Sequence, residues 1–438
     1  MRKFCPFPVD DLPAFRQQLL RASEHTPYFC YLDSNNYPNY PHSTFGSLFA
    51  LGAVHTLTAD SAALNALEAF TKRHQDWLFG FLSYDLKNET EPALTQHSYP
   101  KTDGIQAPLL HFFVPRFIVR ITGEKAEVGL CLTADTDEAT ELAAFKLLLL
   151  TPAGVHSAMA TDIRLHPRWT QEAYAEVVGK IKEHLQRGDI YEMNLCQEFY
   201  AEEVTIHPVE VFNTLNAISR APFSCFFRME EQYLLCASPE RFLKKQHHTL
   251  ISQPIKGTRR RAADETEDAQ LKENLLADEK ERSEHVMIVD LVRNDFSRIA
   301  VPASVRVEEL YGIYTFEQVH QMISTIICEV PENTGVADIL RAVFPMGSMT
   351  GAPKLSAMQL IDRYEPTKRG IYSGAVGYIT PKGNFDFNVV IRSILYNAAN
   401  RYVSVQAGSA LTIDAQAETE YEECLLKARA MIQALEKR

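Results

Sequence analysis

Short apolar runs separated by turn-forming residues make up the first part of the chain. Residues 77–84 and 112–121 are almost continuously apolar and predict two buried strands. From about residue 150 to 168 the pattern loses its periodicity, which predicts a connection between two halves. An amphipathic helix is expected next, with Thr170 as its N-cap and Gly188 as its stop.

The remaining chain is predicted to contain both strands and helices. Strands are expected at residues 190–197, 223–228, 233–236, 249–256, 374–379, 385–395 and 402–407. Helices are expected at residues 209–218, 264–299, 355–361 and 418–436. Because hairpins rather than regular crossovers join the strands, the fold class is predicted as α+β with antiparallel sheets.

Composition narrows the range of functions. The 438 residues carry a formal charge of −12, and no basic stripe beyond residues 259–261 offsets it, so no nucleic-acid partner is expected. No segment reaches about 18 uncharged apolar residues, so no membrane insertion is expected. The eight cysteines lack Cys-x-x-Cys spacing and several lie in apolar runs. They are expected to be reduced thiols of a cytoplasmic protein.

One lysine is well placed for chemistry. Lys256 lies at the end of a predicted strand that begins with apolar residues, and Gly257 and Thr258 follow it. Because glycine has no side chain, a ligand can come close to the backbone there. Glu240 follows another apolar run earlier in the chain. An amine and a carboxylate from neighbouring strands are the parts of a nucleophile with an acid/base partner. The alternative is two exposed side chains at strand ends.

Two acidic pairs would suit a hard divalent cation. Glu281 and Glu284 share one face of a predicted helix, as do Glu420 and Glu423. Carboxylate oxygens with retained waters favour Mg2+, whereas the alternative is two solvated helix faces. Arg392 lies in a stretch predicted as an apolar strand, so it needs a carboxylate partner from the protein or from a ligand.

Four motifs occur in one order along the second half. They are Pro-Ile-Lys-Gly-Thr at 254–258, Asp-Leu-Val-Arg-Asn-Asp at 290–295, Gly-Ser-Met-Thr-Gly-Ala-Pro-Lys at 347–354 and Ile-Arg-Ser at 391–393. Together they closely resemble the chorismate-utilising enzymes, which include anthranilate synthase component I, aminodeoxychorismate synthase component I, and the isochorismate and salicylate synthases. The resemblance covers roughly residues 165–438 and is loose before about residue 160.

The resemblance implies a fold and a division of the chain. The implied fold has two orthogonally packed antiparallel β-sheets with helices on the outside, as in anthranilate synthase component I. An N-terminal region over residues 1–160 and a chorismate-binding catalytic domain over residues 165–438 are expected to interleave in one core.

Within the family that this chain resembles, the residue at position 256 differs between enzymes that catalyse different reactions. Anthranilate and isochorismate synthases carry alanine there, whereas lysine is the form of the aminodeoxychorismate synthases. The implied mechanism has Lys256 attack C2 of chorismate and expel the C4 hydroxyl, with Glu240 as general acid, before ammonia adds at C4 and displaces the lysine. Burial is expected to lower the pKa of Lys256, and a nearby Mg2+ to lower it more strongly.

The resemblance also implies the ligands of the metal and of the substrate. Glu284 and Glu423 match direct Mg2+ ligands, with Glu281 and Glu420 behind them or reached through water. The groups that match those binding the enolpyruvyl carboxylate in the family are Tyr372, Arg392 and the N–H of Gly408. The other substrate-binding residues expected are Thr258, Ser348, Gln197 and Gln321. Gln197 stands on the strand where isochorismate synthases carry a lysine base, and a glutamine cannot activate water in that way.

Three positions depart from the family pattern. Gln321 replaces the histidine of a Val-x-His pattern, and whether His320 compensates is open at this point. Ala410 removes one glycine beside Gly408. Met346 stands where close relatives often have a small residue.

The resemblance implies partners as well. No Gly-x-Cys-x-Gly nucleophile turn occurs in this sequence, so ammonia is expected from a separate glutamine amidotransferase subunit or from free ammonium. The product expected is 4-amino-4-deoxychorismate, for a separate lyase in para-aminobenzoate and folate biosynthesis. The alternatives are anthranilate synthase component I and a non-catalytic chorismate-binding subunit. A regulatory amino acid site, for tryptophan as an example, is left open near Leu32, Asp33 and Ser34.

Overall fold

Antiparallel pairing connects all 20 named strands of the described chain into one hydrogen-bonded ladder. The computed structural model describes residues 2–35, 37, 40–43, 45–96, 99–133, 136–151 and 163–436. The strands before residue 160 are β1 (Arg2–Phe7), β2 (Tyr28–Asp33), β3 (Ser47–Ala59), β4 (Leu78–Leu82), β5 (Leu110–Thr122) and β6 (Lys125–Cys131). The later strands are β7 (His166–Pro167), β8 (Glu192–Ala201), β9 (Phe223–Met229), β10 (Gln232–Ser238), β11 (Arg241–Gln246), β12 (Thr249–Gln253), β13 (Ile255–Arg260), β14 (Arg306–Thr315), β15 (Val319–Glu329), β16 (Gly351–Ala352), β17 (Ala375–Ile379), β18 (Phe385–Val389), β19 (Ser393–Asn397) and β20 (Tyr402–Leu411).

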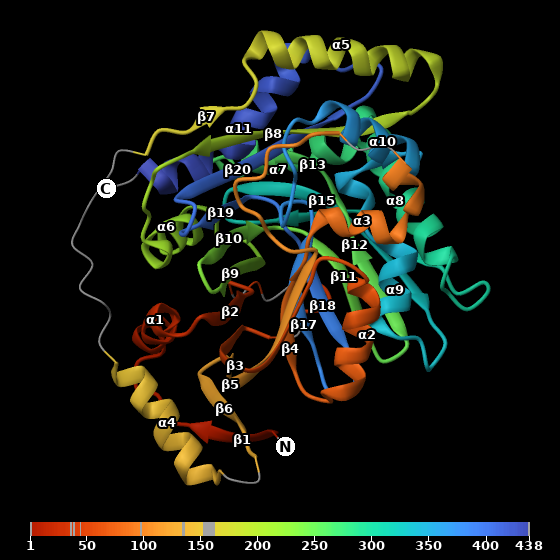
Figure 1. The fold of residues 1–438 in the computed structure, drawn as a ribbon. Coiled ribbons are helices and arrows are strands. Elements are labelled where there is room, and N and C mark those ends of the chain that lie inside the picture. The colour runs from red at the N-terminus through yellow and green to blue at the C-terminus, as the bar shows by residue number, and fades with distance from the viewer. Residues whose placement is uncertain are drawn as a thin grey trace.

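The ladder follows a long path through the molecule. It leads from β8 through β20, β19, β10 and β9 to β2, β3 and β5, and then through β4, β17, β18, β11 and β12 to β15, which also pairs with β13. In Figure 1 strands β8 and β20 run across the view, whereas β4, β17 and β18 run up and down it. The predicted α+β fold with crossed antiparallel sheets is confirmed, and hydrogen bonds continue from one sheet into the other.

Helices cover both sides of the strands (Figure 1). They are α1 (Leu12–Arg21), α2 (Ala63–Arg73), α3 (Lys87–Thr90), α4 (Glu138–Leu150), α5 (Gln171–Arg187), α6 (Pro208–Ser219), α7 (Glu265–Ala277), α8 (Glu279–Ser297), α9 (Val336–Val343), α10 (Lys354–Tyr364) and α11 (Ala417–Glu436). None of the helices in the described part of the chain is long and apolar enough to cross a membrane.

Side chains alternate between two hydrophobic cores. On β2 and β3, Cys30 and Leu48 belong to one core, whereas Phe29 and Phe49 belong to the other. The first core also takes buried residues from α2, α8 and α9, and the second takes them from α1, α5, α6 and α11. The period of two along a strand thus sends successive side chains to opposite faces, each covered by its own set of helices.

The caps predicted for α5 are confirmed. The Thr170 hydroxyl accepts a hydrogen bond from the N–H of Ala173, and Gly188 ends the helix with φ +78°. Residues 152–162 of the predicted connection lie outside the described residues.

Two sequence predictions are wrong in their boundaries. The stretch 264–299 is two helices, because the Asp278 side chain caps α8 by accepting from the N–H of Glu281. The stretch 385–395 is two strands, because Arg392 adopts φ +52° in a bend between β18 and β19. Arg392 is therefore carried by a bend and not by the apolar strand that the sequence predicts.

Candidate active site

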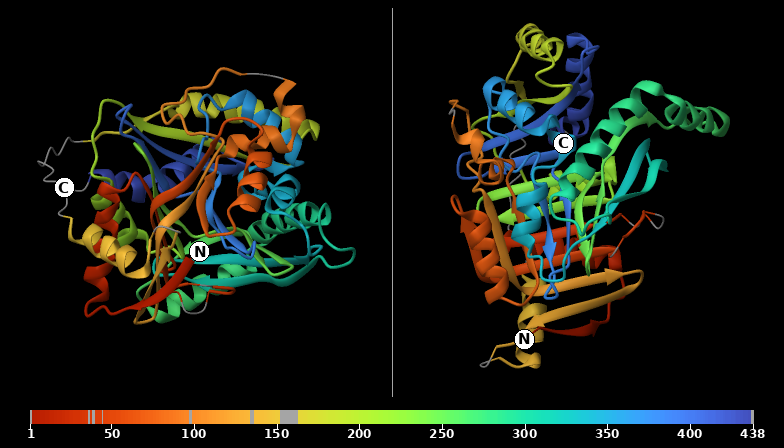
Figure 2. Two further views of the ribbon diagram at one scale, coloured as in Figure 1. Left: turned by 60° about the horizontal axis from the view of Figure 1, so that its bottom comes forward. Right: turned by 90° about the vertical axis from the view of Figure 1, so that its right-hand side faces the viewer.

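The two ends of the ladder meet at Lys256. This residue lies on β13, and its Nζ is 2.8 Å from Oε2 of Glu284 on α8 and 3.7 Å from Oε1 of Glu192 on β8. Figure 2 shows α7 and α8 projecting from the body beside the hairpin of β14 and β15. The amine is thus enclosed by carboxylates from a helix and from a strand at the far end of the ladder.

Gly257 permits this approach. Its φ of +89° lies in the region that favours glycine, and the register shifts between Ile255 and Thr258, where β13 pairs with β15. A Cβ at position 257 would lie 3.2 Å from Oε2 of Glu281. The glycine therefore lets α8 pack closely on the strand that carries Lys256.

The neighbouring carboxylates set the ionisation of Lys256. Burial alone would lower the pKa of Lys256, but Glu192 and Glu284 outweigh burial and raise the pKa above its ordinary value. The lowering expected from burial is therefore wrong for the side chains as they stand. The lysine is an ammonium ion until a neighbour accepts its proton.

Glu240 is a buried acid beside the same strand. Only 5% of the residue is exposed, and the Ser348 hydroxyl donates to its Oε1 at 2.7 Å. Burial raises the pKa of Glu240 to about 8, although hydrogen bonds from Ser348 and from the N–H of Ile255 act to lower it. Glu240 is therefore protonated at neutral pH, as a general acid must be.

Each glutamate of the predicted metal set has a partner from the protein. Glu284 pairs with Lys256, Glu281 pairs with Arg259 at 3.1 Å, and Glu423 pairs with Lys427 at 2.6 Å. The hydroxyl of Ser409 donates to Glu420. Within the described residues, no three His, Cys, Asp or Glu side chains converge closely enough to hold an ion.

The donor chemistry of this set nevertheless fits Mg2+. Glu284 and Glu423 both help to raise the pKa of Lys256, so α8 and α11 direct their charge to one place. Oε2 of Glu192 is buried there without a hydrogen-bond donor. Hard carboxylate oxygens with a surplus of negative charge are what Mg2+ prefers.

Two of the residues expected to hold a carboxylate, Gly408 and Arg392, contact Lys427. Its Nζ donates to the carbonyl of Gly408 at 2.9 Å, and its own carbonyl accepts from Nη1 of Arg392 at 3.4 Å. Arg392 forms no ion pair with a carboxylate in the described part of the chain, and burial lowers its pKa. The guanidinium thus has capacity for a carboxylate that a ligand would supply.

Gly408 needs to be glycine because of β8. A Cβ at this position would lie 2.4 Å from Oδ1 of Asn194 and 2.5 Å from Sγ of Cys196. Sγ of Cys196 is in turn 3.7 Å from the hydroxyl of Tyr372. Tyr372 and Gly408 are therefore brought together by one face of β8.

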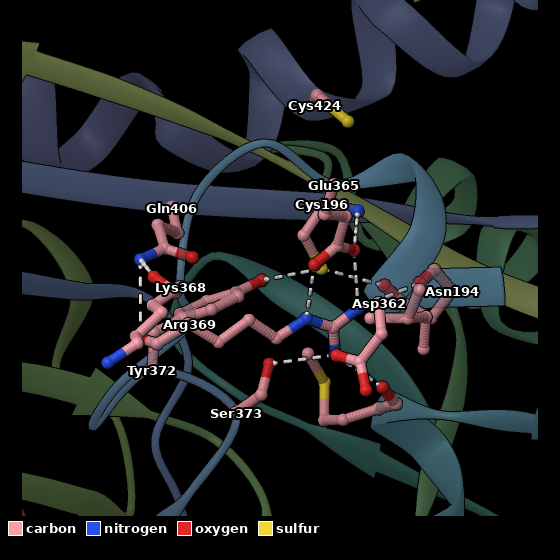
Figure 3. A network of polar contacts seen from close by, with 12 residues as sticks. Asn194, Cys196, Asp362, Glu365, Lys368, Arg369, Tyr372, Ser373, Gln406 and Cys424 are labelled. Carbon is pink, nitrogen blue, oxygen red and sulfur yellow. Dashed lines mark hydrogen bonds and ion pairs between the residues drawn. The ribbon is translucent and has the colours of Figure 1, made fainter. Parts of the chain in front are cut away.

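A buried ion pair fixes the loops around this face (Figure 3). Arg369 pairs with Glu365 at 2.6 Å and donates to the carbonyls of Met349 and Asn194 at 2.6 and 2.9 Å. Glu365 accepts from the N–H of Cys196. The guanidinium thus ties the turn that contains Ser348 to β8 and to the loop before Tyr372.

Gln321 and Thr258 are direct neighbours on paired strands, but their exposure differs. Thr258 is exposed, whereas Gln321 is 5% exposed and its Oε1 has no hydrogen-bond donor. His320 points to the opposite face of β15, where its Nε2 is 3.0 Å from Asp268 of α7. His320 therefore does not take the place of Gln321.

Gln197 is not brought to Lys256. The register of β8 against β20 is unbroken, so Gln197 faces away from the side that Asn194 and Cys196 occupy. Glu192 occupies the side that faces Lys256 instead, and sequence reasoning missed it. The available signal was a glutamate at the start of a predicted strand, since a charged residue is rarely buried there unless it is paired. Sequence reasoning also assigned no role to Lys427, which lies one helical turn after Glu423 on α11.

The segment left open for a regulatory ligand lines a separate hollow. Asp33 and Ser34 lie there with Phe223, Arg241 and Asp386. Arg241 is already paired with Asp386 at 2.9 Å. The carboxylate and the guanidinium of this hollow therefore already neutralise each other, and an amino acid site at this place stays open.

Comparison with known proteins identifies the family. Residues 39–433 match the family described as chorismate binding enzyme. The chain belongs to the chorismate-binding enzymes. Aminodeoxychorismate synthase component 1 of Escherichia coli (strain K12) is 41% identical over 280 residues, which cover 63% of this chain and 61% of that relative. The chain thus spans about three-fifths of the length of that relative.

Other relatives include both aminodeoxychorismate synthases and anthranilate synthases. Aminodeoxychorismate synthase component 1 of Bacillus subtilis (strain 168) is 32% identical over 370 residues, covering 83% of this chain and 77% of the relative. Anthranilate synthase component 1 of Aquifex aeolicus (strain VF5) is 38% identical over 268 residues, which cover 61% of this chain and 54% of that relative.

Solved structures agree on the fold. Anthranilate synthase component I from Streptococcus pneumoniae TIGR4 has a TM-score of 0.77 at 25% identity and covers 90% of this chain and 95% of its own. The menaquinone-specific isochorismate synthase of Escherichia coli has a TM-score of 0.78 at 20% identity, and the match covers 99% of this chain and 94% of that protein. The predicted family membership is confirmed.

The raised pKa of Glu240 predicts a pH dependence of stability. The proton is held in the folded state up to about pH 8 but only up to about pH 4.5 in the unfolded state. The contribution of protonated Glu240 to the free energy of unfolding is fully present below pH 4.5. It falls by about 1.4 kcal/mol for each pH unit as the pH rises from 4.5 to 8. Relative to the wild type, Glu240→Gln should gain stability over this range in urea unfolding.

Glu231→Gln is the matched control, because Glu231 is exposed. Its free energy of unfolding should follow that of the wild type at every pH. If the free energies of unfolding of Glu240→Gln and the wild type ran parallel over this pH range, Glu240 would be ionised in the folded protein.

Proposed function

We propose that this chorismate-binding protein is component I of an aminodeoxychorismate synthase. It is then a transferase that converts chorismate and ammonia to 4-amino-4-deoxychorismate. The observation that supports this is the amine of Lys256 at the centre of the site, 2.8 Å from Glu284, with the buried acid Glu240 beside the same strand. A nucleophile next to a general acid suits the replacement of a hydroxyl group.

The first half of the proposed reaction loads the lysine. Neutral Lys256 attacks C2 of chorismate, and the C4–O bond breaks as Glu240 protonates the departing hydroxyl. Hydroxide is a poor leaving group, so the proton held by Glu240 lowers the barrier. In the second half ammonia attacks C4, the bond from Lys256 to C2 breaks, and the ionised Glu240 recovers a proton from the new ammonium group.

Other residues hold the substrate in this proposal. Arg392, Tyr372 and the N–H of Gly408 bind the enolpyruvyl carboxylate, and Ser348 orients Glu240. Gln321 supplies a polar lining, since its buried oxygen has no donor. Thr258 would contact substrate only from its exposed position on β13, and Gln197 faces the other side of β8 from Asn194 and Cys196.

Mg2+ is the proposed cofactor. Glu284 and Glu423 would hold it, with Glu281 and Glu420 behind them. Lys256 would then lose its ion pair with Glu284, and Lys427 its ion pair with Glu423. When bound, the ion supplies positive charge for the ring carboxylate of chorismate.

The proposed partners follow from the reaction. Ammonia comes from a separate glutamine amidotransferase subunit, in keeping with the name component 1 that the relatives carry. A separate lyase then acts on the product in the cytoplasm.

The alternative is anthranilate synthase component I, which the similarity to the Aquifex aeolicus relative supports. That reaction places nitrogen at C2 and releases the aromatic product without a lyase. A non-catalytic chorismate-binding subunit is the second alternative and would form neither product.

Lys256→Ala should abolish the formation of 4-amino-4-deoxychorismate, because the nucleophile is lost. The assay combines chorismate, Mg2+ and ammonium, with and without added aminodeoxychorismate lyase, and separates the products by chromatography. Chorismate binding should remain within about threefold, since the amine is one contact among several. Fluorescent anthranilate without lyase would contradict the proposal, and so would unchanged turnover of Lys256→Ala.

Glu423→Ala should raise the Mg2+ concentration needed for half-maximal activity on the order of tenfold or more, because a direct ligand is lost. Glu422→Ala is the control on the same helix, since Glu422 is exposed and should leave the Mg2+ titration unchanged. Coincident titrations for the two variants would remove Glu423 from the ligand set.

A further inference from the structure

Arg369 is a buried arginine beside β8 that the proposed reaction does not yet use. The residue is 2% exposed, and its guanidinium carbon lies 4.5 Å from the centre of the Tyr84 ring. Its Nε donates to Oε2 of Glu365 at 2.9 Å, and its Nη2 donates to Oε1 at 2.6 Å. The carboxylate thus neutralises the guanidinium through two parallel hydrogen bonds, which fix its plane.

The other N–H groups of Arg369 hold neighbouring segments in place (Figure 3). Nη1 donates to the carbonyl of Met349 at 2.6 Å and to the hydroxyl of Ser373 at 3.4 Å, and Nη2 donates to the carbonyl of Asn194 at 2.9 Å. With the two bonds to Glu365, all five donors of the guanidinium have an acceptor. A lysine has fewer donors and no planar fork, so it cannot reproduce these contacts.

These contacts converge on the turn that carries Ser348. Asn194 adds two hydrogen bonds to this turn, because its Nδ2 donates to the carbonyl of Ser348 at 3.2 Å and its backbone N–H to that of Thr350 at 2.8 Å. The three successive carbonyls of residues 348–350 are therefore held by Arg369 and by the β8 residue that Arg369 also contacts. The turn is thereby fixed relative to β8.

The position of this turn matters because Ser348 contacts the proposed general acid. The Ser348 hydroxyl donates to Oε1 of Glu240 at 2.7 Å. Glu240 is buried and holds its proton at neutral pH. Because Oε1 accepts this hydrogen bond, the proton of the carboxyl group is directed to Oε2. Ser348 thus sets which oxygen of Glu240 can donate.

We propose that Arg369 is a positioning residue for proton transfer from Glu240. It acts through the carbonyl of Met349, which fixes Ser348 and thereby the orientation of the carboxyl group. A general acid must lie within hydrogen-bond reach of the departing oxygen, and a misplacement of about 1 Å costs on the order of 100-fold in rate. The inference rests on the proposed function, in which Glu240 protonates the departing hydroxyl.

Arg369→Lys tests this role, because it keeps a positive charge beside Glu365 but loses the planar set of donors. We expect kcat for 4-amino-4-deoxychorismate formation to fall about 10- to 100-fold. KM for chorismate should stay within about threefold of the wild type, since the carbonyl of residue 369, which accepts from the N–H of Tyr372 at 3.1 Å, is unchanged. Ser373→Ala is the matched control, because it removes only the contact at 3.4 Å and should leave kcat within about threefold.

A double-mutant cycle with Ser348→Ala tests whether Arg369 acts through Ser348. Ser348→Ala alone should lower kcat by a similar factor, and adding Arg369→Lys should lower it no more than about threefold further. Losses that multiply in the double variant would show that the guanidinium acts independently of Ser348, and would overturn the proposal. A kcat of Arg369→Lys within about threefold of the wild type, or a higher KM at unchanged kcat, would overturn it too.

Folding and function are checked separately. Each kcat is expressed per folded protein, from urea unfolding at the assay temperature. If Arg369→Lys does not fold, the double variant Glu365→Gln with Arg369→Gln enters the same cycle, since removing both charges leaves no unpaired ion in the core. Loss of folding in both would assign the ion pair a structural role and overturn the proposal. A wild type that forms no 4-amino-4-deoxychorismate would defeat the proposed function, and this inference with it.

Discussion

The contact between Lys256 and the carboxylates around it is the constraint on which this structure depends. Lys256 lies on β13 and Glu192 on β8, which stand near opposite ends of the hydrogen-bonded ladder. An ammonium group enclosed by acids satisfies charges that would otherwise repel each other. The path of the sheet, the break between α7 and α8 and the glycine after Lys256 all serve to bring these charges to one point.

Environment gives similar carboxyl groups different roles. Glu240 sits in an apolar, buried position, so it keeps its proton to about pH 8. Glu423 is more exposed and pairs with Lys427, which outweighs burial and lowers its pKa. Glu240 is thus held in the protonated form and Glu423 in the ionised form, which suits the general acid and the Mg2+ ligand of the proposed function.

Much of the fold and some of the site could be predicted from the sequence. The motif at 254–258 marks Lys256, and the capping residues of α5 mark its ends, because both depend on neighbours close in the chain. The bend at Arg392 could not be predicted, since its apolar flanks look like one strand. The contact of Glu192 with Lys256 could not be predicted, because it joins strands from opposite ends of the ladder. Gln197, expected to bind substrate, lies on the same strand but faces the other way.

Covalent attachment of substrate to Lys256 tests the central claim most directly. The protein is mixed with chorismate and Mg2+ in the absence of ammonium, quenched in acid, digested and analysed by mass spectrometry. The account predicts that the peptide containing Lys256 gains the mass of chorismate less one water. An unmodified Lys256 in protein that turns over normally once ammonium is added would contradict it.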